Sequence, residues 1–242
     1  MLVAHPDDEV IAFGALMQRM NKALVVFATD GAPTNRQFWP GYDSREAYAE
    51  VRRQEAREAL RMVGAQPVFL SDHVTGGIAD QELFRRLPQA SLALDKLLAQ
   101  FAPDCLMTLA YEGGHPDHDA CCFIASSAGR RRKIPVWESP LYHRNADGSR
   151  AVQKFPELTG QEIDFRADGG AFQKKMAMFQ TYKSQKLVLD GFHPETEQFR
   201  PVANYDFTRP PMPWKLNYEI WQWPMTGSQV AAEFASYLKQ NG

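Results

Sequence analysis

The chain has 242 residues, of which 44% are hydrophobic and 23% charged, and its formal net charge at pH 7 is −2. These values predict a soluble globular protein of one domain that is large enough to bury a sizeable core. They give no reason to expect a nucleic acid or an anionic membrane as partner, and no stretch predicts a membrane helix of about 18–20 apolar residues or a signal peptide.

Short apolar runs and helical stripes alternate along the first 140 residues. Continuous apolar runs predict buried strands, and apolar residues three and four positions apart predict helices. Because strands that alternate with helices form parallel sheets with right-handed crossovers, the pattern predicts an α/β fold. In chain order we expect a strand at 2–4, a helix over 9–21, a strand at 24–28, a helix over 45–63, a strand at 68–70, a helix over 81–101 that is interrupted near Pro88, a strand at 105–110, a helix over 117–129 and a strand at 134–138.

The pattern is looser after residue 140. The sequence "NADGS" at 145–149 predicts a turn, and helices are expected over 171–186 and 228–239. Between them, "RPPMPWKLNYEIWQWP" at 209–224 is rich in proline and tryptophan and predicts an irregular region over the rim of the sheet. We therefore expect one domain over 1–242, with a core at 1–140 and a region at 141–242 that forms the substrate pocket and a lid.

Polar side chains follow four of the predicted strands. In parallel sheets the ligand site lies beyond the carboxyl ends of the strands, so these side chains should converge on one rim. They are His5, Asp7 and Asp8; Asp30; Asp72 and His73; and His115, Asp117 and His118.

Two motifs among them, "HPDD" at 5–8 and "HPDH" at 115–118, suggest a metal site. A catalytic zinc ion takes three nitrogen or oxygen ligands and keeps one position open for water, and His5, Asp8 and His118 can supply the three. Asp7, next to a ligand, is placed to take a proton from that water. His115 can donate a hydrogen bond or a proton to an oxyanion or a leaving nitrogen.

Each motif also has a simpler interpretation. Asp7 or Asp8 can cap the helix that follows, since carboxylates are favourable at helix N-termini. The presence of both motifs, each after a strand, favours the metal site. Glu9 and Asp117 are then expected behind the ligands, with Glu9 binding backbone donors or a ligand histidine, and Asp117 orienting His5 or His118.

These residues carry a resemblance to a known family. "AHPDDEV", "TDGAP" and "GGHPDHDA" together resemble the LmbE-like (PIG-L) family of zinc-dependent N-deacetylases, over about residues 2–140. The resemblance implies a Rossmann-like three-layer sandwich with a mainly parallel sheet, and hydrolysis of an N-acetyl group, commonly on N-acetylglucosamine or its conjugates. Position by position, the family's zinc ligands fall on His5, Asp8 and His118, its general base on Asp7, and the residue that stabilises the tetrahedral intermediate on His115. One Zn²⁺ per chain is expected, while Fe²⁺ or another divalent ion stays open.

Substrate contacts are less specific in the sequence. The candidates are Asp30, Arg53, Asp72, Tyr111 and His143. Each also has a structural interpretation, such as a turn for Asp30 and an exposed helix face of paired charges for Arg53. The aromatic residues Trp214, Tyr218, Trp221 and Trp223, with His193, are expected in the core or at a contact between subunits rather than at a sugar.

Several alternatives stay open from the sequence. The same metal chemistry can hydrolyse another N-acyl group or an ester, for example in an antibiotic or a thiol-cofactor precursor. A non-catalytic nucleotide-binding module is disfavoured because "AHPDDEV" stands where a glycine-rich loop would be, and a phosphoesterase would usually require two metals.

The three cysteines, Cys105, Cys121 and Cys122, suit reduced thiols in a cytoplasmic protein. The expected partner is a small N-acetylated sugar or conjugate, a homo-oligomer stays open, and the short first strand suggests that the natural start lies upstream.

Overall fold

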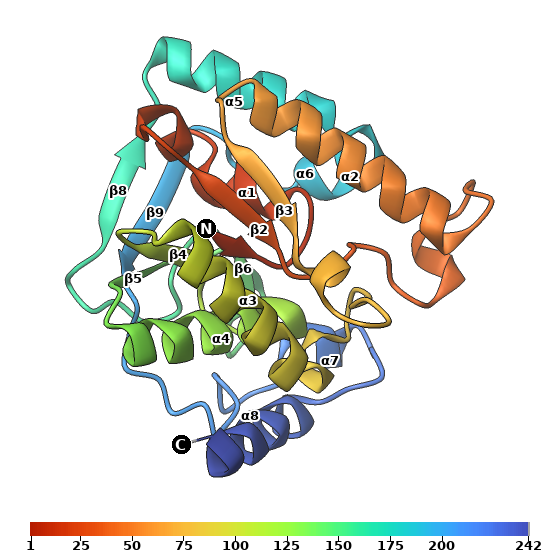
Figure 1. Ribbon diagram of the computed structural model, residues 1–242, viewed down its shortest axis with the longest axis vertical. Helices are drawn as coiled ribbons and strands as arrows, with labels where there is room; N and C mark the ends of the chain where they lie inside the picture. The colour runs from red at the N-terminus through yellow and green to blue at the C-terminus, as the bar shows by residue number, and fades with distance from the viewer. Residues whose placement is uncertain (242) are drawn as a thin grey trace.

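A computed structural model describes residues 1–241, and a mainly parallel sheet lies at its centre (Figure 1). Three strands pair in parallel in the order β1 (Leu2–Val3), β2 (Leu24–Phe27) and β3 (Gln66–Phe69). A second group has β4 (Leu106–Leu109) parallel to β5 (Val136–Ser139), with β9 (Thr196–Pro201) and β8 (Ile163–Arg166) added in antiparallel orientation. Since β1 lies beside β4, the carboxyl ends of the parallel strands meet at one edge.

Helices cover both faces of the sheet (Figure 1). On one side α2 (Arg45–Arg61) contacts α5 (Gly169–Thr181), and α1 (Asp8–Phe13) also contacts α5. On the other side α4 (Pro116–Arg132) lies against α3 (Leu87–Phe101) and α8 (Gly227–Asn241). This arrangement confirms the predicted three-layer α/β fold. Among residues 1–241, none of the helices is both long enough and apolar enough to cross a membrane.

Several predicted boundaries were wrong. The helix expected over 9–21 ends at Phe13, and a separate 3-10 turn follows at Leu16–Arg19. Pro88 does not interrupt a helix: it lies in the first turn of α3, where its missing N–H group costs nothing, and a 3-10 turn at Leu83–Arg85 precedes it. The helix expected over 171–186 ends at Thr181 and is followed by short helical pieces.

These pieces are a 3-10 turn at Lys183–Gln185 and α6 (Lys186–Leu189). The "NADGS" turn is confirmed, because it joins β6 (Tyr142–Arg144) to β7 (Arg150–Val152) in an antiparallel hairpin. The sequence pattern did not reveal β8 and β9.

The segment 209–224 is irregular, as expected, apart from α7 (Asn217–Ile220). It is fastened to the loop that precedes His115: the backbone N–H of Asn217 donates to the carbonyl of Gly113, and its side chain donates to the carbonyl of Gly114. Tyr218 is completely buried. The C-terminal third therefore supports one of the two motif loops directly.

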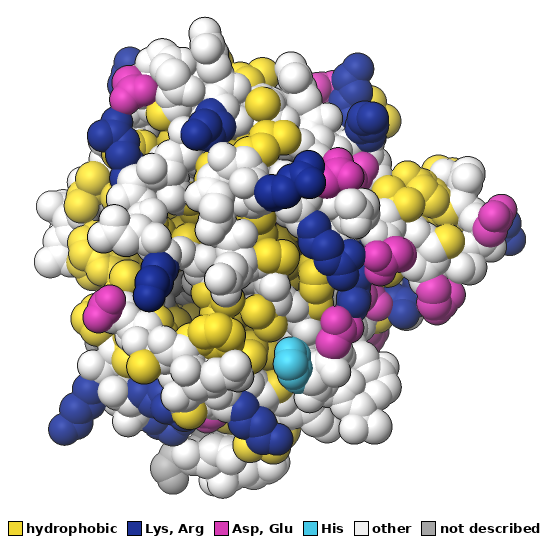
Figure 2. All heavy atoms as spheres, turned by 45° about the horizontal axis from the view of Figure 1, so that its top comes forward, with side chains coloured by type: hydrophobic (Ala, Val, Ile, Leu, Met, Phe, Trp, Pro, Cys, Tyr) yellow, Lys and Arg dark blue, Asp and Glu magenta, His cyan; other side chains and the backbone are white. Residues whose placement is uncertain are grey.

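The cysteines are free, with Cys121 and Cys122 buried in α4 and Cys105 exposed. On the face drawn in Figure 2, basic and acidic side chains are interspersed around a central area of hydrophobic side chains. That face therefore presents no large region of a single sign, in keeping with the small net charge.

Candidate active site

The two motifs meet in one cavity at the carboxyl edge of the sheet. Its volume is about 490 Å³. The loop after β1 and the loop between β4 and α4 contribute to its floor, together with a segment that lies before α3. Six polar side chains line this floor: His5, Asp7, Asp8, Asp80, His115 and His118. The structure thus brings all five predicted metal-binding and catalytic residues together and adds Asp80.

The turn of the first motif is held by its own carboxylate. Oδ2 of Asp8 accepts hydrogen bonds from the backbone N–H groups of Ala4 (3.1 Å) and His5 (2.7 Å). Asp7 has φ 126° and ψ −28°, a conformation that residues other than glycine rarely adopt. Strain of this kind persists where the surroundings over-determine it, often at functional sites. The turn therefore presents two adjacent carboxylates to the cavity.

Side chains that can bind a metal lie close together in two overlapping groups, His5, His115 and His118 in one and His5, Asp80, His115 and Asp117 in the other, and Asp8 contacts both His5 and His118. Nε2 of His118 lies 3.2 Å from Oδ1 of Asp8, and Nδ1 of His5 lies 3.5 Å from Oδ2. Two ligands at about 2.0–2.1 Å from a tetrahedral ion are about 3.3 Å apart, so each separation by itself suits a pair of ligands of one metal, each pair using a different oxygen of Asp8. Two imidazoles and one carboxylate with open positions fit zinc and also Fe²⁺. The residues present therefore fit a catalytic divalent ion.

Both ring nitrogens of His115 contact neighbouring protein groups. It is the N-cap of α4, and its Nδ1 accepts a hydrogen bond from the backbone N–H of Asp117 at 3.1 Å. Its Nε2 lies 3.2 Å from Oδ1 of Asp80, and an ionised carboxylate accepts hydrogen bonds but cannot donate one. The proton of the neutral ring is therefore on Nε2. Burial lowers the pKa of His115, which favours this neutral donor form.

Two further carboxylates, Asp80 on the cavity floor and Asp117 beneath it, contact the histidines. Nε2 of His5 is 3.2 Å from Asp80 and 3.3 Å from Asp117, as expected of groups that orient a metal ligand. Asp117 also accepts backbone hydrogen bonds from Gln81 (2.6 Å) and Leu83 (3.0 Å), which fastens the segment carrying Asp80. Sequence reasoning missed Asp80 because it lies in a loop without motif or periodicity.

The charges of this group support one another. Burial by itself lowers the pKa of His5, but Asp80, Asp117 and Asp8 outweigh that effect and hold the pKa well above its usual value. Burial likewise opposes ionisation of Asp80, but His5 and His115 hold its pKa well below the usual range. Asp80 is therefore anionic and can orient both imidazoles.

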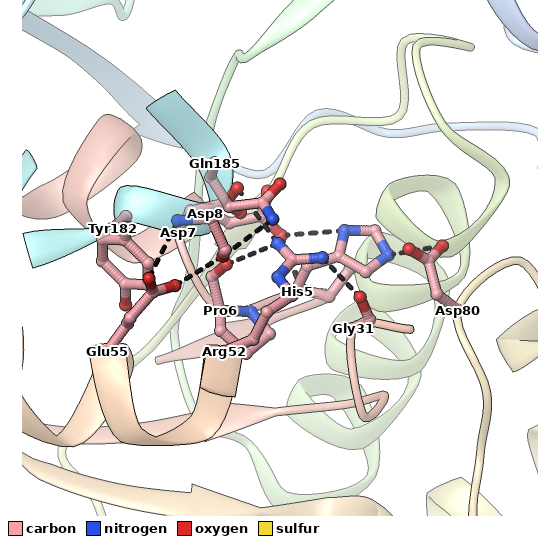
Figure 3. Close-up of polar contacts among 12 residues, drawn as sticks. His5, Pro6, Asp7, Asp8, Gly31, Arg52, Glu55, Asp80, Tyr182 and Gln185 are labelled. Atoms are coloured by element: carbon pink, nitrogen blue, oxygen red, sulfur yellow. Dashed lines mark hydrogen bonds and ion pairs between the residues drawn. The ribbon is translucent and has the colours of Figure 1, made fainter. Parts of the chain in front are cut away.

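Arg52 of α2 holds Asp7 in place (Figure 3). It is 4% exposed, and its guanidinium donates to the carbonyl oxygens of Gly31 and Pro6 and lies 3.0 Å from Oδ2 of Asp7. Burial raises the pKa of Asp7 to about 7, and Arg52 is the strongest influence that opposes the rise. The arginine therefore fixes the carboxylate and favours its charged form.

Glu9 lies beneath this turn, as expected. Its carboxylate accepts a hydrogen bond from the backbone N–H of Asp7 at 3.0 Å and another from the hydroxyl of Tyr182. Burial raises the pKa of Glu9 to about 8. Glu9 therefore supports the backbone of the turn and does not line the cavity.

None of the five predicted substrate-binding residues lines this cavity. Two of them, Arg53 and Asp72, pair with each other at 2.6 Å near the surface. Oδ2 of Asp30 accepts from Arg45 at 2.6 Å, and the hydroxyl of Tyr111 donates to the carbonyl of Arg209 at 2.7 Å. His143 contacts Glu112 at 3.3 Å and faces a neighbouring cavity. The arginine of α2 that reaches the site is Arg52, one position before the predicted one.

Aromatic side chains form the outer walls of the cavity. Trp221 and Trp223 line it and are not buried in the core, whereas Tyr218 is in the core. The Trp223 ring meets the His115 ring edge-on at 4.8 Å. The other aromatic wall residues are Phe38, Tyr48, Tyr142 and Phe192. Such walls can pack against the apolar faces of a sugar or an aglycone.

A comparison with protein-family models matches residues 1–129 to the family described as "PIG-L: GlcNAc-PI de-N-acetylase". A search of curated protein sequences finds no match. These residues contain both motifs, so the match includes the whole floor of the cavity.

Solved structures share the fold. The A40926 pseudoaglycone deacetylase Dbv21 is 21% identical with a TM-score of 0.66, over 84% of this chain and 96% of that one. The N,N'-diacetylchitobiose deacetylase from Pyrococcus horikoshii is 20% identical with a TM-score of 0.56, over 82% and 81%. GalB, the 4-carboxy-2-hydroxymuconate hydratase from Pseudomonas putida KT2440, is 16% identical with a TM-score of 0.54, over 84% and 96%. The fold therefore accommodates more than one reaction, and the reaction must be argued from the site.

Proposed function

Because the chain belongs to the PIG-L family of GlcNAc-PI de-N-acetylases, we propose that it hydrolyses the N-acetyl group of an N-acetylglucosamine-type sugar conjugate, releasing acetate and a free amine. The observation that carries the proposal is the meeting of the two motifs, with Nε2 of His118 3.2 Å from Oδ1 of Asp8 and Asp7 beside them. Two deacetylases among the structural neighbours support it.

His5, Asp8 and His118 would hold the divalent ion, which we propose is zinc. When bound, such an ion polarises a carbonyl group and lowers the pKa of water toward about 7. A site with one metal also favours amide hydrolysis over the phosphoesterase alternative, for which a pair of metals is usual.

The chain's own residues carry the proton transfers. Asp7, held by Arg52, accepts a proton from the attacking water as the new C–O bond forms at the acetyl carbon. The Nε2–H group of His115 is shared between Asp80, which orients it, and the oxygen that gains negative charge. Asp7 then returns its proton to the sugar nitrogen as the C–N bond breaks. The products are acetate and the amine.

Residues after 140 contribute much of the pocket wall. Tyr142, Phe192, Trp221 and Trp223 all line the cavity. This supports our proposal of a single domain in which 1–140 holds the catalytic groups and 141–242 shapes the substrate pocket.

The test is amine release from a panel of N-acetylglucosaminides, with the metal content of the same sample measured. The panel includes N-acyl groups longer than acetyl and an O-acetyl sugar, which address the alternative hydrolases. We expect Asp7→Asn to keep its metal and to lose at least about 100-fold in kcat, a typical general-base contribution. Full activity of the metal-loaded variant would exclude Asp7 as the base, and a metal-loaded wild type that releases no amine would exclude deacetylation.

A further inference from the structure

The cavity wall near Arg52 carries two uncharged polar side chains, Tyr48 of α2 and Gln185 of the 3-10 turn at Lys183–Gln185. Tyr48 is 5% exposed and Gln185 is 6% exposed, and both line the cavity. The ring centre of Tyr48 lies 5.9 Å from the guanidinium carbon of Arg52, which itself pairs with Asp7. The two side chains therefore lie on the side of the cavity that holds the proposed base. The family match ends at residue 129 and gives no role to Gln185.

A chain of hydrogen bonds fixes which end of the Gln185 amide meets the protein; Gln185 and Glu55 are labelled in Figure 3. The carboxylate of Glu55 accepts from the backbone N–H group of Ser184 at 2.9 Å and from its hydroxyl group at 2.5 Å. Because the proton of that hydroxyl goes to Glu55, the hydroxyl oxygen can only accept from Gln185, whose Nε2 lies 3.1 Å away. The other proton of Nε2 is donated to the hydroxyl oxygen of Tyr48 at 2.6 Å. Both amide protons of Gln185 are therefore used within the protein.

One acceptor and one donor are left over at this wall. Oε1 of Gln185 accepts no hydrogen bond within residues 1–241, and it is not sealed inside the protein. The hydroxyl of Tyr48 accepts from Gln185, and among the same residues its own proton is donated to no protein group. A hydroxyl group of a ligand is complementary to this pair, since its oxygen can accept from Tyr48 while its proton is donated to Gln185. An ionised carboxylate has no proton for Oε1, and an ether can satisfy only Tyr48.

We propose that Tyr48 and Gln185 bind one hydroxyl group of the substrate and so determine which N-acetylated sugars are hydrolysed. The proposal rests on the proposed deacetylation, because the subsite acts on a substrate whose N-acetyl group lies beside Asp7. Buried groups that hydrogen-bond a substrate hydroxyl discriminate against an analogue without it, since they are then left without a partner. The anchoring of Gln185 through Ser184 to Glu55 keeps Oε1 in place before the substrate arrives.

The experiment combines removal of a substrate hydroxyl with removal of the group that binds it. The parent substrate is the N-acetylglucosaminide that the wild type hydrolyses best, and three analogues lack the hydroxyl group at sugar position 3, 4 or 6. For the wild type we expect kcat/KM to be lower by at least about tenfold for one of the analogues. In Tyr48→Phe and in Gln185→Met, kcat/KM for the parent should fall to within about twofold of that for this analogue, mainly through a higher KM.

Tyr42→Phe is the matched control. Tyr42 packs against Tyr48 with the ring centres 4.9 Å apart, but it does not line the cavity, so this variant should discriminate as the wild type does. Calorimetry measures the binding of the parent and the analogue without turnover, using metal-loaded Asp7→Asn with and without Tyr48→Phe. The loss of affinity for the analogue should appear only where Tyr48 is present.

Two results would overturn the subsite and leave the proposed deacetylation standing. One is equal kcat/KM for the parent and all three analogues in the wild type, and the other is undiminished discrimination in both Tyr48→Phe and Gln185→Met. A metal-loaded wild type that hydrolyses no N-acetylglucosaminide contradicts the proposed function instead.

Discussion

Replacing Arg52 with methionine should damage both the fold and the pH dependence of the reaction. Arg52 is 4% exposed, and its guanidinium donates to the carbonyls of Gly31 and Pro6 and pairs with the carboxylate of Asp7. Methionine fills a similar volume but donates no hydrogen bond. Truncating one partner of a buried ion pair costs about 3–5 kcal/mol. We expect the free energy of unfolding to fall by this amount, a large fraction of the roughly 5–15 kcal/mol of a typical domain.

The effect on activity has a defined sign. Burial raises the pKa of Asp7 to about 7 even with Arg52 present, so removal of the cation raises it further. The base must be ionised to accept a proton, and the acidic limb of kcat/KM should therefore move to higher pH. An ion pair at about 4 Å and an effective dielectric of 20 contributes about 4 kcal/mol, and one pH unit corresponds to about 1.4 kcal/mol. A displacement of at least about 1 pH unit is expected.

The neighbouring arginine provides the control. Arg53 pairs with Asp72, whose side chain is 52% exposed, and such surface pairs contribute about 0–1 kcal/mol. Thermal unfolding and pH–rate profiles are measured for Arg52→Met, Arg52→Lys and Arg53→Met at equal metal content. The lysine variant keeps the charge, so its acidic limb should stay near that of the wild type. If Arg52→Met unfolds and titrates like Arg53→Met, Arg52 does not position the base.

Two further predictions concern the loop before His115 and the metal. Gly114→Ala should lower the free energy of unfolding by about 3 kcal/mol, because a Cβ atom there would lie 2.0 Å from the carbonyl oxygen of Tyr142. Gly170→Ala is the control, since a Cβ atom at that position meets nothing closer than 3.9 Å. Equal melting temperatures for the two variants would contradict the packing around Gly114. Removal of the bound metal by a chelator should lower the melting temperature. A metal ion present at about 1,000 times its dissociation constant stabilises the folded protein by about 4 kcal/mol. In a chain of this size each kcal/mol corresponds to about 2–4 °C in melting temperature. Added zinc should restore the melting temperature of the wild type but not that of His118→Ala, and scanning fluorimetry measures both. If zinc also restores the melting temperature of His118→Ala, the ion binds elsewhere.

The floor of the site was predictable because each motif is contiguous. His5, Asp7 and Asp8 share one turn, and parallel topology brings that turn to His115 and His118. Residues outside the motifs were not predictable in the same way. Successive residues on a helix point about 100° apart, and α2 carries charges on most of its surface, so its sequence did not show that Arg52 rather than an adjacent arginine faces inward. The tryptophans were ambiguous because aromatic residues serve cores and binding walls alike.

The charge of the site explains why so many acidic residues can be buried together. Asp7, Asp8, Asp80 and Asp117 are each at most 6% exposed, and Arg52 is the only arginine or lysine that forms an ion pair with any of them within the described chain. Backbone N–H groups and two imidazoles satisfy part of this negative charge, but burial still raises the pKa of Asp7. Like charges at these distances need a cation or protons between them. A divalent ion between His5, Asp8 and His118 would neutralise the cluster without protonating the base, so the same arrangement would serve stability and hydrolysis together.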